Sequence, residues 1–321
     1  MTPRPSTTQR GAALLLAMII VALIVTMAAG MVWMQSRAVS IEAAERARAQ
    51  SAWILSGALD WSRLILREDQ RGSRQRGNAY DALTEPWATP LAESRLSTFL
   101  AVDKSNADDG PEAFLSGSIA DAQGRYNLKN LVAQGKIDPG ELAIFERLCS
   151  AVSVDASVAQ RIATNLRDAS TGTSSAAAPI MPQSVGQLTW FGIDEATVHA
   201  LEQFVVLLPD VTPINVNTAA NEVLSAAVPG LDTATAEHIA QVRQRTPFKT
   251  VAEFYAQAGL TMPTTTPSPK LDVRSNYFEV RTRLRLLDRV LVERSLLQRL
   301  PNGQSNVLLR ERVAGLDQVG S

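Results

Sequence analysis

Uncharged residues run without interruption over Ala12–Met34, and only Thr26 and Gly30 dilute the aliphatic character of this run. A helix built on these residues is longer than the ~30 Å hydrocarbon core of a bilayer, because each residue adds ~1.5 Å. The pattern therefore predicts a membrane-spanning helix near the N-terminus.

The flanks of this run indicate its orientation and leave one alternative open. Arg4 and Arg10 precede the run, so the positive-inside rule places the N-terminus in the cytoplasm. A secretory signal peptide has a shorter apolar region of ~7–15 residues followed by small residues. Small residues do occur over Ala28–Gly30, so cleavage there is the alternative to a retained anchor.

The segment after the anchor lacks proline as far as Asp69 and is rich in Ala, Leu, Glu and Arg, which are good helix formers. Its apolar residues recur at helical spacing, with Arg63 and Glu68 off the stripe. The stripe consists of Ile54, Leu55, Ala58, Trp61, Leu64 and Ile65. The pattern fits either one helix from Ala12 to Glu68 or an anchor followed by a separate amphipathic helix.

Helical spacing also dominates the middle of the chain, in IDPGELAIFERLCSAV, DASVAQRIATNLRD, IDEATVHALEQFVVL, TAANEVLSAA, TATAEHIAQVRQR and TVAEFYAQAG. STGTSSAAAPIMPQS, from Ser170, and TMPTTTPSPK, from Thr261, are predicted linkers. The expected helix caps are Asp155, Asp194, Asn217 or Thr218, Asp232 or Thr233, and the Thr250–Glu253 capping box.

Beyond Leu271 the apolar period changes to two. YFEVRTRLRLL alternates apolar and charged residues and predicts a half-buried strand, and VLVERSLLQRL and SNVLLRERV predict two more. Pro301-Asn302-Gly303 predicts the turn between the last two. GSIAD, from Gly117, predicts a short strand before the helices. We therefore expect an α+β fold in which a sheet begins before Arg125, is completed after Leu271, and is covered by the N-terminal helix.

Composition excludes several classes of function. The chain has 321 residues, a formal net charge of −1 and one cysteine, Cys149, so it forms no intramolecular disulfide. His199 and His238 are the only histidines, and both lie in predicted amphipathic helices. No GxSxG, CxxC, phosphate loop or HExxH occurs. We predict no catalytic residues and no enzyme activity.

Metal binding has one candidate tract, VDKSNADDGPE from Val102. It carries Asp103, Asp108, Asp109 and Glu112, whose oxygens suit a hard cation but lack EF-hand spacing. A solvated loop is the preferred interpretation.

PINVNTAANEVLSAAVPGLDTATAEHIAQVRQRTPF resembles a helix-hairpin-helix (SAM-like) unit, which some membrane-anchored receptors use to bind DNA. DNA binding requires phosphate neutralisation by Lys and Arg. Residues 212–262 contain three basic residues against four acidic ones. Those residues are Arg243, Arg245 and Lys249 against Glu222, Asp232, Glu237 and Glu253. We therefore do not expect nucleic acid as a partner, although a competence-type DNA receptor remains the rival function.

The N-terminus resembles the class III leader of type IV pilins and pseudopilins, a short basic leader ending in glycine before a long apolar helix. The resemblance implies that a prepilin peptidase cuts between Gly11 and Ala12 and N-methylates Ala12. Most such proteins carry glutamate at the fifth mature position, which here is Leu16. That departure is typical of one branch, the K-type minor pseudopilins of type II secretion systems.

Four further segments resemble the K family in the same order: GALDWSRLILRED, DALTEPWATPL, SGSIADAQGRYNLKNLV and the PINVN segment. Lys129 stands where the family more often has asparagine. The resemblance implies a pseudopilin fold with a large inserted all-α domain. The expected boundaries are a leader at 1–11, an N-terminal helix at 12–68, a first core part at 69–124, helical parts at 125–211 and 212–262, a linker at 263–271, and C-terminal strands at 272–321.

The resemblance further implies a function at the tip of the type II secretion pseudopilus, initiating assembly and contributing to the export of folded exoproteins across the outer membrane. A minor pilin of a type IV pilus is a second alternative. Implied partners are the I and J minor pseudopilins, the major pseudopilin, the prepilin peptidase, the inner-membrane secretion platform and secreted proteins. The anchor would lie in the inner membrane with the globular part in the periplasm. No cofactor is required, although the family raises calcium binding in the helical region, with no ligands assigned.

Overall fold

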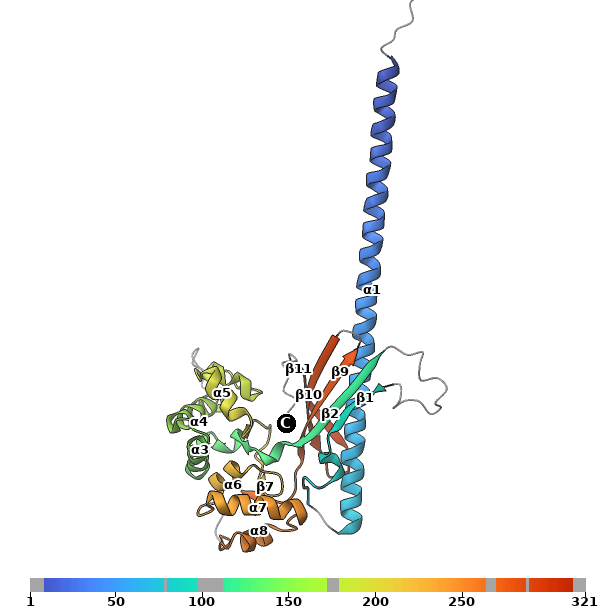
Figure 1. Cartoon of the computed structure of the whole chain (residues 1–321). Coiled ribbons are helices and arrows are strands. Elements are labelled where there is room, and N and C mark those ends of the chain that lie inside the picture. The colour runs from blue at the N-terminus through green and yellow to red at the C-terminus, as the bar shows by residue number, and fades with distance from the viewer. Residues whose placement is uncertain are drawn as a thin grey trace, which may run out of the picture. The chain divides into compact units, whose positions relative to one another are not determined.

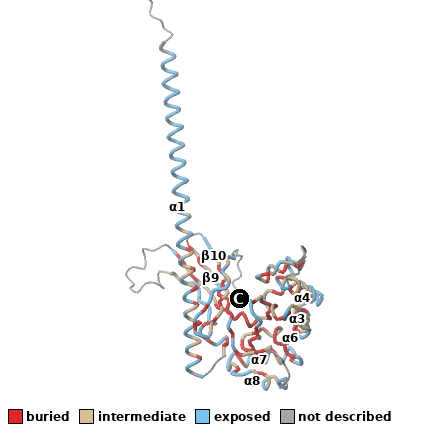
Figure 2. The backbone as a smooth tube through the Cα atoms, turned by 180° about the vertical axis from the view of Figure 1, so that it is seen from behind, coloured by how far each residue is buried: buried red, intermediate tan, exposed pale blue. Residues whose placement is uncertain are grey.

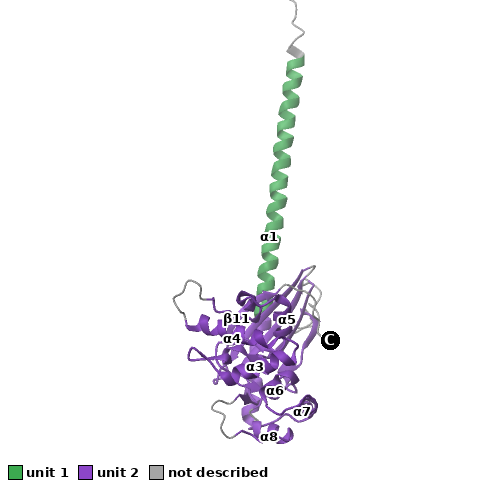
Figure 3. Ribbon diagram, turned by 90° about the vertical axis from the view of Figure 1, so that its left-hand side faces the viewer, with its two compact units in different colours: residues 1–56 green, residues 57–321 purple. Residues whose placement is uncertain are grey.

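The computed structural model describes residues 9–77, 80–96, 112–171, 179–263, 270–286 and 289–313. The chain divides into two compact units, residues 1–56 and residues 57–321, which Figure 3 shows in green and purple.

The first unit consists, within its described residues, of the N-terminal part of helix α1 (Gln9–Arg76) (Figure 1). α1 is one uninterrupted helix, so of the two arrangements that the sequence allowed, the single helix is observed. It continues past Glu68 as far as Gly77, which adopts a positive φ of 67° and donates its backbone N–H to the carbonyl of Arg74. A glycine in this conformation is a common helix terminator.

The second unit contains a five-stranded antiparallel sheet in the order β1-β2-β9-β10-β11. The strands are β1 (Leu91–Arg95), β2 (Ala113–Asp121), β9 (Tyr277–Leu286), β10 (Arg289–Arg299) and β11 (Ser305–Val313). The three C-terminal strands agree with the period-two prediction. β2 extends further than the predicted GSIAD segment, and β1 was not predicted.

Two glycines of the sheet occupy positions that other residues would not fit, one because the neighbouring strand is too close and one because the turn needs a positive φ. Gly117 of β2 lies opposite Thr282 of β9, and a Cβ atom on it would stand 2.8 Å from the carbonyl oxygen of Arg281. Gly303 has a φ of 85° in the turn between β10 and β11, as the Asn-Gly sequence predicted.

One face of the sheet packs against the C-terminal part of α1. Leu59 and Leu66 of α1 join Phe278 of β9 and Trp87 in one buried cluster, which also contains Ile119, Val280 and Leu297. The Trp87 and Phe278 rings meet edge to face, with centroids 5.3 Å apart. Trp87 comes from the 3-10 helix η1 (Pro86–Ala88). This packing is the predicted cover of the sheet by the N-terminal helix.

The remaining helices come after β2 and before β9 along the chain. These two strands are neighbours in the sheet, with Asp121 opposite Phe278. The helices are α3 (Pro139–Ala151), α4 (Ala156–Thr171), α5 (Glu195–Glu202), α6 (Asn221–Ala227), α7 (Thr233–Arg245) and α8 (Val251–Gln257), with 3-10 turns η3 (Ala122–Gly124), η4 (Leu128–Leu131) and η5 (Val185–Phe191). The two-residue strands β3 (Tyr126–Asn127), β4 (Val132–Ala133), β5 (Lys136–Ile137), β6 (Val205–Val206), β7 (Ile214–Asn215) and β8 (Leu271–Asp272) connect them.

These helices share the largest buried core of the second unit, coloured red in Figure 2. Tyr126 and Phe145 stack at its centre, with ring centroids 5.5 Å apart. Since the chain leaves and re-enters the sheet at adjacent strands, the topology is compatible with an inserted region, and its domain boundaries remain a prediction.

Two local predictions in this region were wrong. The helix expected over residues 193–207 ends at Glu202, because Val205 and Val206 pair in parallel with Tyr126 and Asn127. The N-cap of α6 is Ala220 rather than Asn217 or Thr218. Asp194, Asp232 and Thr250 do cap their helices as predicted, and Asp155 accepts from the backbone N–H of Ser157.

Candidate functional site

The N-terminal half of α1 is an apolar surface without a cover in the structure. Leu16 is 61% exposed, and its neighbours along the helix are similarly exposed as far as Met34. Thr26 satisfies its hydroxyl by donating to the carbonyl of Leu23 at 2.9 Å, so no unpaired polar side chain interrupts the run. Among the described residues, α1 is the one helix long and apolar enough to cross a membrane, by length and composition. Exposed apolar area of this extent requires lipid or protein around it.

The predicted processing residues lie at the start of this surface. Gly11, Ala12 and Leu16 are all helical and exposed. A Cβ atom built on Gly11 would meet no heavy atom within 4 Å. Among the described residues, no contact therefore requires glycine at residue 11.

The candidate catalytic groups do not assemble into a site. His199 is a solvent-exposed residue of α5, with Glu202 at 3.9 Å, and His238 is exposed on α7 and lies 3.2 Å from the side-chain amide of Gln257. Cys149 is fully buried, and burial raises the pKa of its thiol to about 12. A thiol with that pKa is protonated at neutral pH and is a poor nucleophile.

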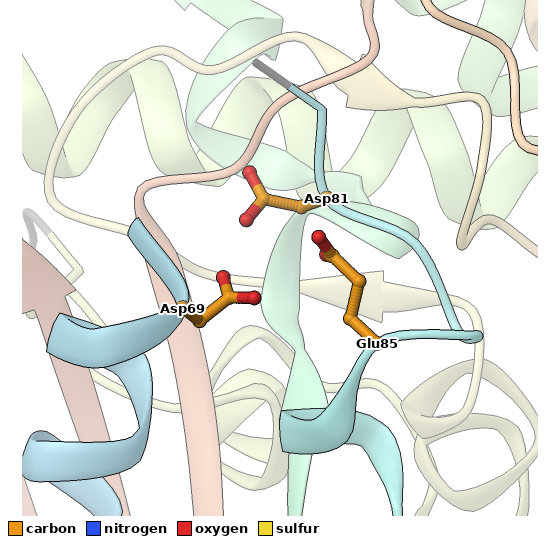
Figure 4. A group of neighbouring side chains, drawn as sticks. All are labelled: Asp69, Asp81 and Glu85. Atoms are coloured by element: carbon orange, nitrogen blue, oxygen red, sulfur yellow. The ribbon is translucent and has the colours of Figure 1, made fainter. Parts of the chain in front are cut away.

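One group of carboxylates in the described residues has the spacing of a cation site. Figure 4 shows Asp69, Asp81 and Glu85 pointing toward one another, with oxygens within 4.8 Å. However, Arg299 already supplies a cation: its guanidinium donates to both oxygens of Asp81 at 2.6 Å and lies 3.4 Å from Asp69. These residues therefore form a buried ion-pair cluster and do not fit a calcium site.

Glu85 belongs to the same cluster and is held by other donors. One carboxylate oxygen accepts from the backbone N–H of Ala82 and from the indole N–H of Trp87, both at 2.9 Å. Burial raises the pKa of this carboxyl, while these two bonds favour its ionised form. Glu85 therefore fixes the local conformation of residues 82–87, from which Trp87 packs on Phe278 of the sheet.

The acidic tract suggested by the sequence lies almost entirely outside the described residues. Asp103, Asp108 and Asp109 lie outside the described residues, and Glu112 pairs with Arg95 at 2.8 Å. Calcium binding remains an expectation from family resemblance without a ligand set in this chain.

In the segment from α6 to α7, groups that could bind DNA contact other parts of the chain. Arg243, one of its three basic residues, is buried and donates to the carbonyls of Val216 and Ala219 at 2.7 and 2.6 Å. Gly230 of the connecting hairpin lies against Leu260, which would be 3.6 Å from a Cβ on Gly230. Asp232, with its negative charge, caps α7. A phosphate at this hairpin would therefore meet the carboxylate of Asp232.

A membrane-length apolar helix that continues into a helix packed on an antiparallel sheet defines the pseudopilin fold. Two family models described as type II secretion system (T2SS), protein K, match residues 124–210 and 214–274. These matches and the relatives described below support assignment of the chain to the type II secretion system protein K family, a class of minor pseudopilins.

Individual relatives cover nearly the whole chain. Type II secretion system protein K of Pseudomonas aeruginosa is 29% identical over 328 residues, covering 96% of this chain and 94% of the relative. The protein of the same name from Pectobacterium carotovorum subsp. carotovorum is 27% identical, covering 90% and 92%. A chain in the crystal structure of the GspK-GspI-GspJ complex from enterotoxigenic Escherichia coli has the same fold, with a TM-score of 0.63, 20% identity, and coverage of 85% of this chain and 99% of that one.

Proposed function

We propose that this minor pseudopilin starts pseudopilus assembly at the tip, together with minor pseudopilins of the I and J types, and so contributes to export of folded exoproteins. It does so without catalysis. The observation that carries this proposal is Leu16, an exposed apolar residue at the position where most pilin-like subunits carry glutamate.

The physical argument concerns charge in an apolar environment. A buried carboxylate at the fifth mature position neutralises the N-terminal amine of a neighbouring subunit, since an unpaired charge there is costly. A chain with leucine at that position offers no such partner to a neighbour's amine. It is therefore suited to the first position of a filament rather than to its shaft.

Membrane topology and processing follow from the same helix. The anchor is proposed to lie in the inner membrane with Arg4 and Arg10 on the cytoplasmic side and residues 57–321 in the periplasm. The prepilin peptidase would cut between Gly11 and Ala12 and methylate the new N-terminus. The exposed apolar surface of α1 would then pass from lipid to contacts with the major pseudopilin, assembled by the inner-membrane secretion platform.

Partner binding tests the proposal directly. The similar fold occurs in a crystal structure titled as a GspK-GspI-GspJ complex, which supports I and J types as partners. We expect the full-length chain in detergent to co-elute with I and J pseudopilins in size-exclusion chromatography at about 10 μM. Failure to co-elute, together with duplex DNA binding that weakens steeply with salt, would favour the competence-type receptor instead.

Substitution at residue 16 tests the tip assignment. A carboxylate in the middle of a membrane helix costs ~2.5–3.5 kcal/mol, and less near its end, where Leu16 lies. We expect Leu16→Glu to be inserted and processed, with a modest reduction in secretion of an exoprotein, and Leu16→Ala to be nearly silent. Leu15→Glu, which adds the same charge one residue earlier, is the matched control and should have the same effect. If Leu16→Glu improved secretion or entered the filament shaft while Leu15→Glu did not, the tip assignment would be wrong.

A further inference from the structure

Helices α3 to α8 form the helical region, and two segments of the chain connect this region to the sheet. The outgoing crossing follows β2, and the returning crossing precedes β9. β2 and β9 are adjacent, so both crossings lie at the same end of the sheet. Two neighbouring crossings of this kind ordinarily make a hinge, because a few residues at element ends can absorb a rotation. Here the crossings are instead bridged by buried polar side chains.

Asp121, the last residue of β2, is the centre of these contacts and is almost fully buried. One of its carboxylate oxygens accepts from the hydroxyl of Ser275 at 2.6 Å, the hydroxyl of Thr218 at 2.6 Å and the side-chain amide of Asn215 at 2.9 Å. The other oxygen accepts from the backbone N–H of Gln123 at 2.8 Å. One carboxylate thus connects the outgoing crossing, the returning crossing and the β7–α6 segment of the helical region.

A second set of bonds ties the same residues to the rest of the sheet. The backbone N–H of Ser275 donates to Asp81 at 2.8 Å, and the Ser275 carbonyl accepts from Arg299 of β10 at 2.6 Å. The side-chain amide of Asn215 also lies 3.0 Å from the carbonyl of Asp81. The side chain of Gln123 accepts from the backbone N–H of Asn276 at 2.6 Å and donates to the carbonyl of Pro213 at 3.2 Å.

We infer that Asp121, with Asn215, Thr218 and Ser275, is a lock that fixes the helical region on the sheet, so that the two move as one body. The hydroxyls of Ser275 and Thr218 and the side-chain amide of Asn215 all donate to the buried carboxylate of Asp121, and opening the joint would break these three bonds together. Without the carboxylate, the hydroxyls of Ser275 and Thr218 would lose the acceptor of their short hydrogen bonds, and opening the joint to water would offer them a new one.

A cavity of about 650 Å³ lies beside the joint, with Gln123 and Asn276 in its lining. Asp210 and Val211 line it from the helical side, and Gln70, Arg74 and Gln298 line it from the side of α1 and the sheet. Polar groups across it already pair, since the hydroxyl of Tyr277 donates to Asp210 at 2.5 Å and accepts from Gln298 at 2.9 Å. These bonds join the two walls of the cavity independently of Asp121.

Distance measurements across the joint test the inference. Spin labels on Gln241→Cys of α7 and Asn306→Cys of β11 place one probe on each side, at exposed positions, and the buried Cys149 thiol does not react. In the full-length protein in detergent we expect one narrow distance distribution. Asp121→Ala should broaden it or add a second population. Asp272→Ala is the matched control, because Asp272 lies in the returning crossing, while its side chain accepts from the backbone N–H of Val273 and pairs loosely with Arg274 at 3.8 Å. It should leave the distribution unchanged.

A single narrow distribution for Asp121→Ala, equal to that of the unsubstituted chain, would overturn the inference. If that variant does not fold, hydrogen exchange of the unsubstituted protein decides. The amides of Gln123, Ser275 and Asn276 should then exchange together, among the slowest of the second unit. Exchange of these amides as fast as that of exposed loops would show that the joint opens freely and that no lock exists.

Discussion

Gly11→Ala is expected to leave the chain unprocessed, with its first eleven residues retained and Ala12 unmethylated. The reason is recognition rather than folding. A Cβ atom at residue 11 meets nothing within 4 Å, so alanine fits the helix without strain. Alanine is also a better helix former than glycine by ~1 kcal/mol. Any loss must therefore come from the peptidase, and secretion of an exoprotein should fall to the level of a strain without this protein.

Intact mass spectrometry of the membrane-extracted protein checks this expectation. The unsubstituted chain should begin at Ala12 and carry one added methyl group, whereas Gly11→Ala should retain its full length. Gly30→Ala is the matched control, because it makes the same change in the same helix at an equally open position. It should be processed normally. A mature chain beginning near Met31 would instead mean that the apolar run is a discarded signal peptide, and it would refute the pseudopilin proposal.

The parts of this fold that sequence predicted correctly depend on short-range patterns. The helical character of residues 12–68 follows from good helix formers and a long stretch without proline, although the pattern left one helix or two open. The last three strands follow from a period of two. The turn at Asn302-Gly303 needs only two residues to specify it. In each case the signal lies within a few residues of the structure that it determines.

The parts that sequence missed depend on partners far apart in the chain. α5 ends early because Val205 and Val206 pair with Tyr126 and Asn127, about eighty residues earlier. Thr218 does not cap α6 because its hydroxyl donates to Asp121. No periodicity or local motif connects residues at such separations, so patterns in one sequence could not predict these contacts.

The features of the candidate site also fall into those that a local pattern predicts and those that depend on residues far apart in the chain. The apolar run and Leu16 are visible in the sequence because their meaning depends on position along one helix. The ion-pair cluster of Asp69, Asp81 and Arg299 was not predicted, because Arg299 is 218 residues from Asp81. An arginine in an apolar-alternating strand is the one signal that could have raised the question, since arginine is rarely buried without a partner.

Replacing Arg299 with methionine is expected to lower the free energy of unfolding by about 3–5 kcal/mol, because it leaves buried carboxylates without their cation. The side chains of Arg299 and Asp81 are only 6% and 3% exposed, so water cannot take over this role in the folded state. Methionine keeps much of the side-chain volume over the Phe278 ring, where the guanidinium now lies 4.8 Å from the ring centroid. The loss in free energy of unfolding should therefore reflect the missing positive charge rather than a cavity.

Chemical unfolding followed by tryptophan fluorescence measures this loss, because Trp87 is buried against Phe278 in the same part of the sheet. Arg274→Met is the matched control: Arg274 is 61% exposed and lies 3.8 Å from Asp272, so its loss should cost no more than about 0.5 kcal/mol. Adding Asp81→Asn to Arg299→Met should recover part of the stability, since it removes one unpaired buried charge. Equal costs for Arg299→Met and Arg274→Met, with no recovery in the double variant, would mean that the cluster contributes nothing beyond a surface ion pair.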